Sequence, residues 1–177
     1  MRFEIEGLAR DEVEYLTFDP ASCSDAAIRQ QPLRRPAFLA VVSAASLAAT
    51  LARKSNGRVD GFVVEAPTAG GHNAPPRGER RLNERGEPVY GDRDVVDLAK
   101  MRELGLPFWL AGGTGSPESL QSALAEGAAG VQVGTLFAYC AESGLDAELK
   151  ARVMAALMAG SVTLRTDPRA SPQGFPF

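Results

Sequence analysis

The chain contains little of the chemistry that marks metal centres and disulfide-bonded proteins. Its 177 residues include one histidine, His72, and two isolated cysteines, Cys23 and Cys140. Because no second histidine and no cluster of cysteines or carboxylates stands at ligand spacing, no metal site is expected. Two separate cysteines favour reduced thiols over a disulfide or a metal pair.

Long apolar runs and an excess of positive charge are also missing. The longest uncharged run, Pro36–Ala52, is shorter than the roughly 18 residues of a membrane span and contains hydroxyl side chains. The amino-terminal residues are rich in acidic side chains and lack the apolar core of a signal peptide. A formal net charge of -3 leaves no basic footprint for nucleic acid. We therefore expect a cytoplasmic protein with no nucleic-acid and no membrane partner.

What the sequence does show, from residue 36 onward, is an alternation of apolar strands and helices. Strands are expected at Ala37–Ser43, Gly61–Ala66, Pro107–Ala111 and Gly130–Gly134. Helices are expected at Ala45–Asn56, from Asp94 through Leu104 with Val95 on the apolar face, and after the N-caps Ser116 and Asp146. The last two helices should bury Leu120, Ala123 and Leu124, and Leu149, Val153, Ala156 and Leu157. Residues 1–35 carry no motif, with possible short strands at Arg2–Glu6 and Glu14–Phe18.

Four strand–helix units in a row predict an α/β fold with a parallel sheet. A (β/α)8 barrel needs eight such units and typically ~250 residues. Two arrangements therefore fit the pattern: a small open sheet, or the second half of a barrel. The expected organisation is an amino-terminal segment over 1–35, the strand–helix units over 36–160, and a tail rich in proline and glycine over 161–177.

The single histidine follows the second predicted strand. His72 comes directly after Gly70 and Gly71, whose missing Cβ atoms let the backbone approach a flat ligand closely. The carboxyl ends of parallel strands are where chemistry sits, and an imidazole can take a proton from a carbon acid near neutral pH. For a lone histidine the alternative is a hydrogen-bonded structural role. The long connection over residues 67–92 is predicted to form a lid or wall over this site, with a disordered insertion as the alternative.

Two further strand ends carry glycines at the start of a helix, Gly112 with Gly113 and Gly134 with Thr135. Bare backbone N–H groups and the positive end of a helix dipole both favour a phosphate at such a place. In barrels a phosphate commonly lies between the loops after strands 7 and 8. The pair of glycine loops therefore predicts a phosphate site, with plain turn chemistry as the alternative.

Three motifs in order carry a family resemblance: EAPTAGGH (Glu65–His72), LAGGTG (Leu110–Gly115) and GVQVGTLFAYCAES (Gly130–Ser143). Over about residues 36–160 the chain resembles the FMN-dependent nitronate monooxygenases, also called 2-nitropropane dioxygenases, and their relatives the flavin-dependent enoyl-acyl-carrier-protein reductases. The resemblance implies a partial TIM barrel, the carboxyl-terminal half, that binds FMN. It also implies oxidation of a nitronate or nitroalkane by dioxygen. The alternatives are enoyl-thioester reduction and a truncated remnant without catalysis.

The resemblance also assigns residues by position. His72 matches the family's catalytic base, Gly113 a glycine facing the FMN phosphate, and Gln132, Val133, Gly134 and Thr135 the phosphate segment. Gly70, Gly71 and Gly112 are expected at the cofactor with them, whereas Glu142 and Ser143 match a Glu-Ser pair without an assigned role. Ser43 stands where a basic residue is often found. Half a barrel leaves two unpaired sheet edges, so a homodimer or a complementary barrel half is expected as partner.

Overall fold

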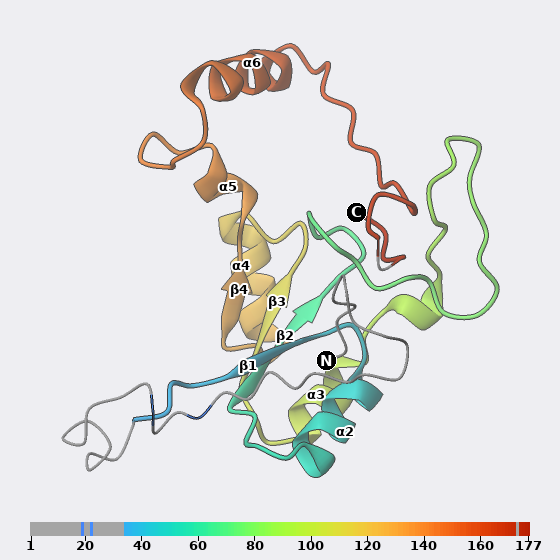
Figure 1. Cartoon of the computed structure of the whole chain (residues 1–177), viewed down its shortest axis with the longest axis vertical. Helices are drawn as coiled ribbons and strands as arrows, with labels where there is room; N and C mark the ends of the chain where they lie inside the picture. The colour runs from blue at the N-terminus through green and yellow to red at the C-terminus, as the bar shows by residue number, and fades with distance from the viewer. Residues whose placement is uncertain (1–18, 20–21, 23–33, 173) are drawn as a thin grey trace. The chain divides into compact units, whose positions relative to one another are not determined.

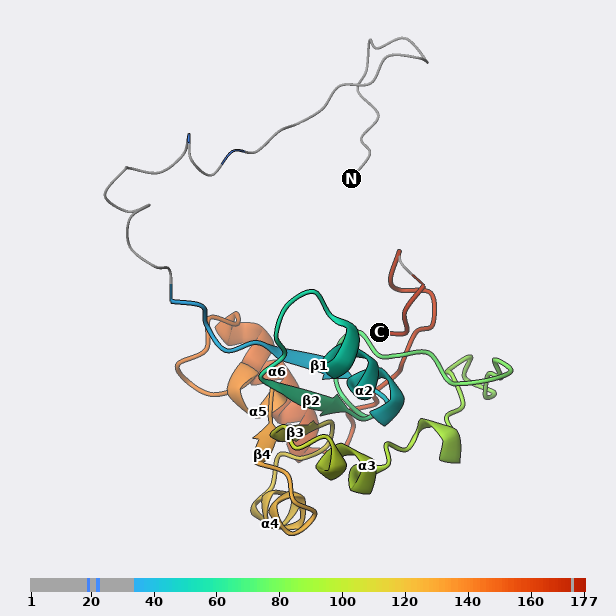
Figure 2. The same ribbon diagram turned by 90° about the horizontal axis from the view of Figure 1, so that it is seen from below.

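The computed structural model describes residues 19, 22, 34–172 and 174–177. Cys23 and the two short strands expected near the amino terminus lie outside these residues. The chain divides into two units, residues 1–36 and 37–177. All helices and strands that the structure describes belong to the second unit (Figures 1 and 2).

The second unit is built on a parallel sheet of four strands in the order β1-β2-β3-β4. The strands are β1 (Leu39–Val42), β2 (Gly61–Glu65), β3 (Phe108–Ala111) and β4 (Gly130–Gln132). Each lies within a predicted strand, so the parallel α/β arrangement is confirmed. Glu65 pairs with Ala111, and Ala111 with Gln132. This register places the ends of β2, β3 and β4 side by side, and the loops that follow them emerge at one edge, here called the carboxyl edge.

Among the residues that the structure describes, six helical segments follow the strands or connect them. They are α2 (Ala45–Lys54), the 3-10 turn η1 (Asp92–Asp94), α3 (Leu98–Glu103), α4 (Pro117–Ala125), α5 (Thr135–Ala138) and α6 (Ala147–Met158). The predicted caps of α4 and α6 are confirmed, because Ser116 Oγ accepts from Ser119 N at 3.1 Å and Asp146 Oδ1 from Leu149 N at 2.9 Å. In the described part of the chain no helix is long and apolar enough to cross a bilayer.

The prediction of a helix beginning at Asp94 is wrong. Asp94 ends η1, and its carboxylate accepts from the backbone N–H groups of Gly91 and Arg77, both at 2.8 Å. The helix instead begins after Asp97, whose side chain accepts from Lys100 N at 3.1 Å. Val95, expected on the buried face, is 73% exposed.

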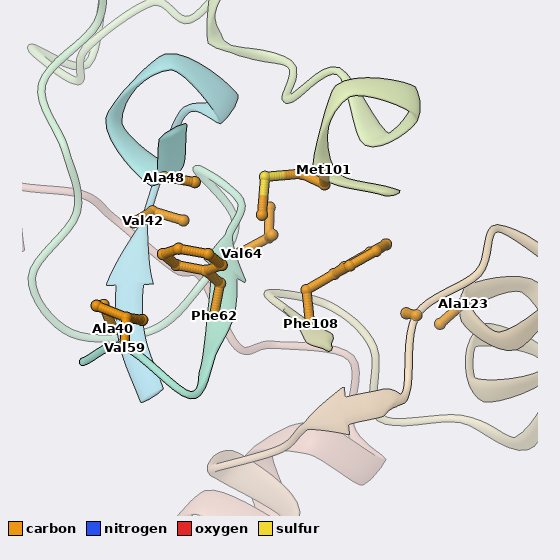
Figure 3. Packing of buried hydrophobic residues seen from close by; sticks show 10 residues of the cluster. Ala40, Val42, Ala48, Val59, Phe62, Val64, Met101, Phe108 and Ala123 are labelled. Carbon is orange, nitrogen blue, oxygen red and sulfur yellow. The ribbon is translucent and has the colours of Figure 1, made fainter. Parts of the chain in front are cut away.

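The core lies between the sheet and the pair α2 and α3. Figure 3 shows Phe62, Val64 and Phe108 on the face of the sheet towards Met101 of α3. Phe62 and Met101 are fully buried. On the opposite face Trp109 lies against two glycines, since a Cβ added to Gly61 or Gly130 would come within 3.2 Å of the indole. Large side chains on β2 and β3 therefore fill both faces of a short sheet.

The last two helices contribute less to the core than their sequences indicate. In α4 only Ala123 is buried, whereas Leu120 and Leu124 stay exposed. In α6 none of the predicted apolar face is buried, and Leu157 is 48% exposed. Apolar spacing identified both helices, but burial depends on a neighbouring element that the described chain does not supply.

Candidate functional site

Three loops meet at the carboxyl edge, and Gly112 marks their closest approach. Gly112 has φ +102°, and a Cβ there would stand 2.9 Å from Ala69 N and 3.0 Å from Thr68 Oγ1. The loop after β3 therefore packs directly on the loop that leads to His72. Thr114 Oγ1 donates to Gln132 O at 3.3 Å and so joins the β3 loop to the end of β4.

The glycine loop after β3 presents unpaired backbone donors. Gly113 also has a positive φ, +70°. Within the described residues, the N–H groups of Gly112 and Gly113 donate to no backbone carbonyl. Two adjacent free N–H groups on a turn form the kind of concavity that binds an anion.

The segment after β4 also presents unpaired backbone N–H groups. No helix was expected at Thr135, but this residue begins α5, with Gly134 as an N-cap that carries no side-chain hydrogen bond. The N–H groups of Thr135, Leu136 and Phe137 have no acceptor in the part of the chain that the structure describes. Val133 and Leu136 line Gly115, which brings this segment against the β3 loop. Both predicted glycine loops thus fit a phosphate group.

The imidazole of His72 is exposed and free to meet a ligand. Neither ring nitrogen forms a hydrogen bond with a described residue, so the structure gives no support to a hydrogen-bonded structural role. The ring packs edge-to-face against Phe177, with centroids 5.0 Å apart and planes at 80°. Gly71 before it has φ +93°, which lets the chain turn sharply at the end of the loop.

Asn73, next to His72, anchors the loop. It is only 4% exposed, and its Nδ2 donates to Ala69 O at 3.0 Å while its backbone N–H donates to Pro176 O at 2.8 Å. Its Oδ1 is buried with no hydrogen-bond partner among the described residues. A cavity of about 10 Å³, lined in part by Asn73 and Glu65, lies beside it. That volume suits one water molecule, which would satisfy the amide oxygen.

Glu65 and Tyr90, two of the titratable groups that line the same cavity, have shifted pKa values. Burial raises the pKa of the Glu65 carboxyl above its ordinary value. Burial, followed by the negative charges of Asp94 and Glu65, also raises the pKa of the Tyr90 hydroxyl. Tyr90 therefore stays a neutral donor, and its hydroxyl donates to Ala74 O at 3.0 Å.

Arg77 brings a cation to the end of β1. Its Nη2 donates to Ser43 O at 2.5 Å and its Nη1 to Arg93 O at 2.9 Å. Both acceptors are neutral carbonyls, so the guanidinium charge is not cancelled by these bonds. Ser43 stands where the family resemblance would place a basic residue, and the only local signal for Arg77 is its position in the run that follows His72.

Ser143 and Glu142 are adjacent in sequence but differ in their contacts. Ser143 Oγ donates to Ala138 O at 2.6 Å and closes the end of α5. Lys150 of α6 reaches back to the same turn, donating to the carbonyls of Cys140, Ala141 and Ser143 at 3.1 to 3.3 Å. Cys140 is a free thiol. Glu142 is exposed and forms no hydrogen bond to a described residue, so the turn rests on Ser143 and Lys150.

These features define an α/β protein whose parallel strands present glycine loops and a free imidazole at one edge. A family model, nitronate monooxygenase, matches residues 5–168. The chain therefore belongs to the nitronate monooxygenase family, a family of oxidoreductases, and the resemblance carried by the three motifs is confirmed. The matched range also includes most of the amino-terminal segment in which no motif was found. None of the curated proteins compared with the chain matches it.

Proposed function

We propose that the chain binds FMN at the carboxyl edge and uses His72 as the base in nitronate oxidation. The observation that carries this proposal is the close packing of Gly112 on Ala69 and Thr68. It joins the loop of the imidazole to the loop of free N–H donors, so one ligand with an anionic end can reach both.

The phosphate of FMN would be held by the β3 and β4 loops. The free backbone N–H groups of Gly112, of Gly113 and of the residues after Gly134 would donate hydrogen bonds to the phosphate oxygens. An anion can be bound in this way without a lysine or arginine. Gln132 and Val133 carry the chain into the second loop, where Thr135 adds a hydroxyl. Gly70 and Gly71 have no side chains that would block a flat ring above the β2 loop; a Cβ on either would meet no atom within 4 Å.

His72 would remove or steer the proton on the carbon that bears the nitro group. Neither ring nitrogen is used by a hydrogen bond to a described residue. The neutral form of the imidazole therefore has a nitrogen lone pair that can accept a proton, as a general base requires. The bound flavin would supply electron acceptance, with dioxygen as the final oxidant. The Arg77 guanidinium at the end of β1 adds positive charge at the edge where an anionic nitronate would approach.

The fold proposed for the complete site is a (β/α)8 barrel of which these four strand–helix units form the carboxyl-terminal half. A cytoplasmic setting and a small-molecule nitronate or nitroalkane substrate follow from the same proposal. The supporting observation is that all strands are parallel and follow one another in order across the sheet, as consecutive barrel strands do.

The test compares FMN and riboflavin binding to the purified chain, followed by oxygen uptake with propionate 3-nitronate. FMN should bind more tightly than riboflavin, because riboflavin lacks the phosphate that the glycine loops receive. His72→Asn should bind FMN as the wild type does but lose turnover by about 10²- to 10⁴-fold, the usual contribution of a general base.

Two results would contradict the proposal. Equal affinity for riboflavin and FMN would show that the glycine loops do not bind the phosphate. Full turnover in His72→Asn would show that His72 is not the base. Anaerobic bleaching of the bound flavin by NAD(P)H, without oxygen uptake on the nitronate, would instead favour enoyl-thioester reduction.

A further inference from the structure

The carboxyl-terminal segment Asp167–Phe177, here called the tail loop, closes on itself. Asp167 N donates to Phe177 O at 2.8 Å, and Phe177 N donates back to Asp167 O at 3.0 Å. Pro168 and Pro176, next to the two closing residues, are buried. The reciprocal pair of hydrogen bonds fixes the position of Phe177 relative to the rest of the tail loop.

The long connection that follows β2 holds the start of the tail loop and the residues just before it. Arg80 Nη2 donates to Pro168 O at 3.2 Å in the tail loop. Just before the tail loop, Arg85 Nη2 donates to Leu164 O at 2.7 Å and Thr166 N donates to Glu87 Oε1 at 3.1 Å. Figure 1 shows the carboxyl-terminal segment beside this connection. Side chains of the connection thus bind backbone atoms at one place in the tail loop and at two places just before it.

The far end of the tail loop reaches the loop of the imidazole. Asn73 N donates to Pro176 O at 2.8 Å, and the ring of Phe177 packs on the ring of His72. No hydrogen bond to a described residue orients the imidazole. The edge-to-face packing on Phe177 is the ring contact that the imidazole makes among the described residues, and the bond from Asn73 N to Pro176 O holds the backbone beside it.

We propose that Phe177 is a positioning residue for His72 and that the tail loop holds this ring in place. The inference rests on the proposed function only for the use of the imidazole as a base; the restraint itself is a property of the chain. A histidine ring has about three χ1 wells and about two χ2 wells. A ring released from Phe177 would spend about one sixth of its time in any one of them, so kcat should fall about six-fold.

The first test reads the imidazole directly, because His72 is the only histidine in the chain. Histidine-labelled protein gives a single set of ring signals by NMR, with no cofactor or substrate needed. Phe177→Ala should shift both ring proton signals by removing the ring current of the phenyl group. Phe177→Tyr keeps the ring and should leave the signals near their original positions.

Phe175→Ala is the matched control. Phe175 is in the same tail loop and 45% exposed, against 53% for Phe177, and it has no ring contact with the imidazole. Its removal should leave the His72 signals in place. Both side chains are largely exposed, so neither variant should unfold the chain, and circular dichroism checks this. Unchanged His72 signals in Phe177→Ala, or equal shifts in both alanine variants, would overturn the proposal.

The second test separates positioning from the proposed function. In an FMN-loaded, active chain, Phe177→Ala should lower kcat about six-fold while KM stays near the wild-type value, and Phe177→Tyr should restore kcat. If the wild type shows no nitronate oxidation but the NMR shifts appear, the ring contact on which the positioning rests stands and the proposed function fails. An active wild type with unchanged kcat in Phe177→Ala would overturn the positioning.

Discussion

At the scale of single residues, Gly112 is the position where the site tolerates the least change. Its backbone lies in the region that L side chains rarely adopt, and its neighbours across the gap are backbone and short side-chain atoms of the β2 loop. A contact under 3 Å with Ala69 N can be relieved only by moving one of the two loops. The distance between the two loops, where a phosphate would bind, therefore depends on the absence of a Cβ atom at Gly112.

Gly112→Ala should consequently weaken both folding and FMN binding. The positive φ and the close contact together should lower the free energy of unfolding by about 1–3 kcal/mol. Urea denaturation measures the first effect, and a fluorescence titration with FMN measures the second. Gly57→Ala is the control, because a Cβ there meets no atom within 4 Å and no positive φ is involved. Equal stability of the two variants would show that the loops are not held as close as described.

The signals that make His72 a candidate base are all local. They are its residue type, its place after a buried strand and the two glycines before it. The packing of Phe177 on its ring was not predictable, because the two residues are far apart in sequence and no periodic pattern connects them. The same holds for Arg77 and Ser43, which meet across two loops.

At the scale of elements, local signals located the four strands of the sheet and the helices α2, α4 and α6, but neither η1 nor α5. The strands were found because runs such as Phe62, Val63 and Val64 are buried on both faces of a parallel sheet. The caps at Ser116 and Asp146 were found because a capping side chain binds a backbone N–H three residues away. Both kinds of signal lie within a few residues of the element that they define.

The misplaced start of α3 has a long-range cause. Asp94 and Asp97 are equally good N-caps by residue type. The carboxylate of Asp94 is occupied by Arg77 N, 17 residues earlier in the same connection between β2 and β3, and by Gly91 N. Asp97 is left to cap the helix. The choice between the two was made by a tertiary contact that local reading of the sequence does not contain.

The docking of the tail onto the long connection should depend on pH through Glu87. Hydrogen bonds from Asn83 and from Thr166 N, followed by the charges of Arg85 and Arg165, hold the pKa of this carboxyl below its ordinary value of 4.5. A carboxyl with a depressed pKa stabilises the fold above its unfolded value and loses that contribution as pH falls through its folded value. The contact should therefore be intact at neutral pH, begin to weaken below about pH 4.5 and be lost as pH falls through the lower pKa of the folded state.

Glu87→Gln tests this dependence. The amide keeps one acceptor for Thr166 N but cannot titrate, so the acid-dependent loss of protection at Thr166 should disappear. Hydrogen exchange of the Thr166 amide, followed from pH 6 to pH 3, measures the effect. Glu84→Gln, an exposed neighbour in the same connection, is the control and should behave as the wild type does. Persistence of the acid step in Glu87→Gln would assign it to another group.

At the scale of the whole molecule, apolar surface is left uncovered on an edge strand of the sheet and on two helices. In the described chain β1 and β4 each pair with a single strand, so the sheet has two open edges. Val41 on β1 is 53% exposed, and in the helices Phe137 and Met158 are 68% and 88% exposed. Open edges flanked by apolar side chains favour association with another sheet.

We therefore expect the isolated chain to self-associate through its open edge at β1. Val41→Lys should shift the chain towards the monomer, because a lysine on an edge strand disfavours pairing with a second sheet. Light scattering after size-exclusion chromatography, over a concentration series, measures the mass. Thr163→Lys adds the same charge at an exposed position outside the sheet and should leave the mass unchanged. A wild type that stays monomeric at every concentration would mean that the edge and the apolar side chains near it are protected within the chain itself, and a partner sheet would then not be needed.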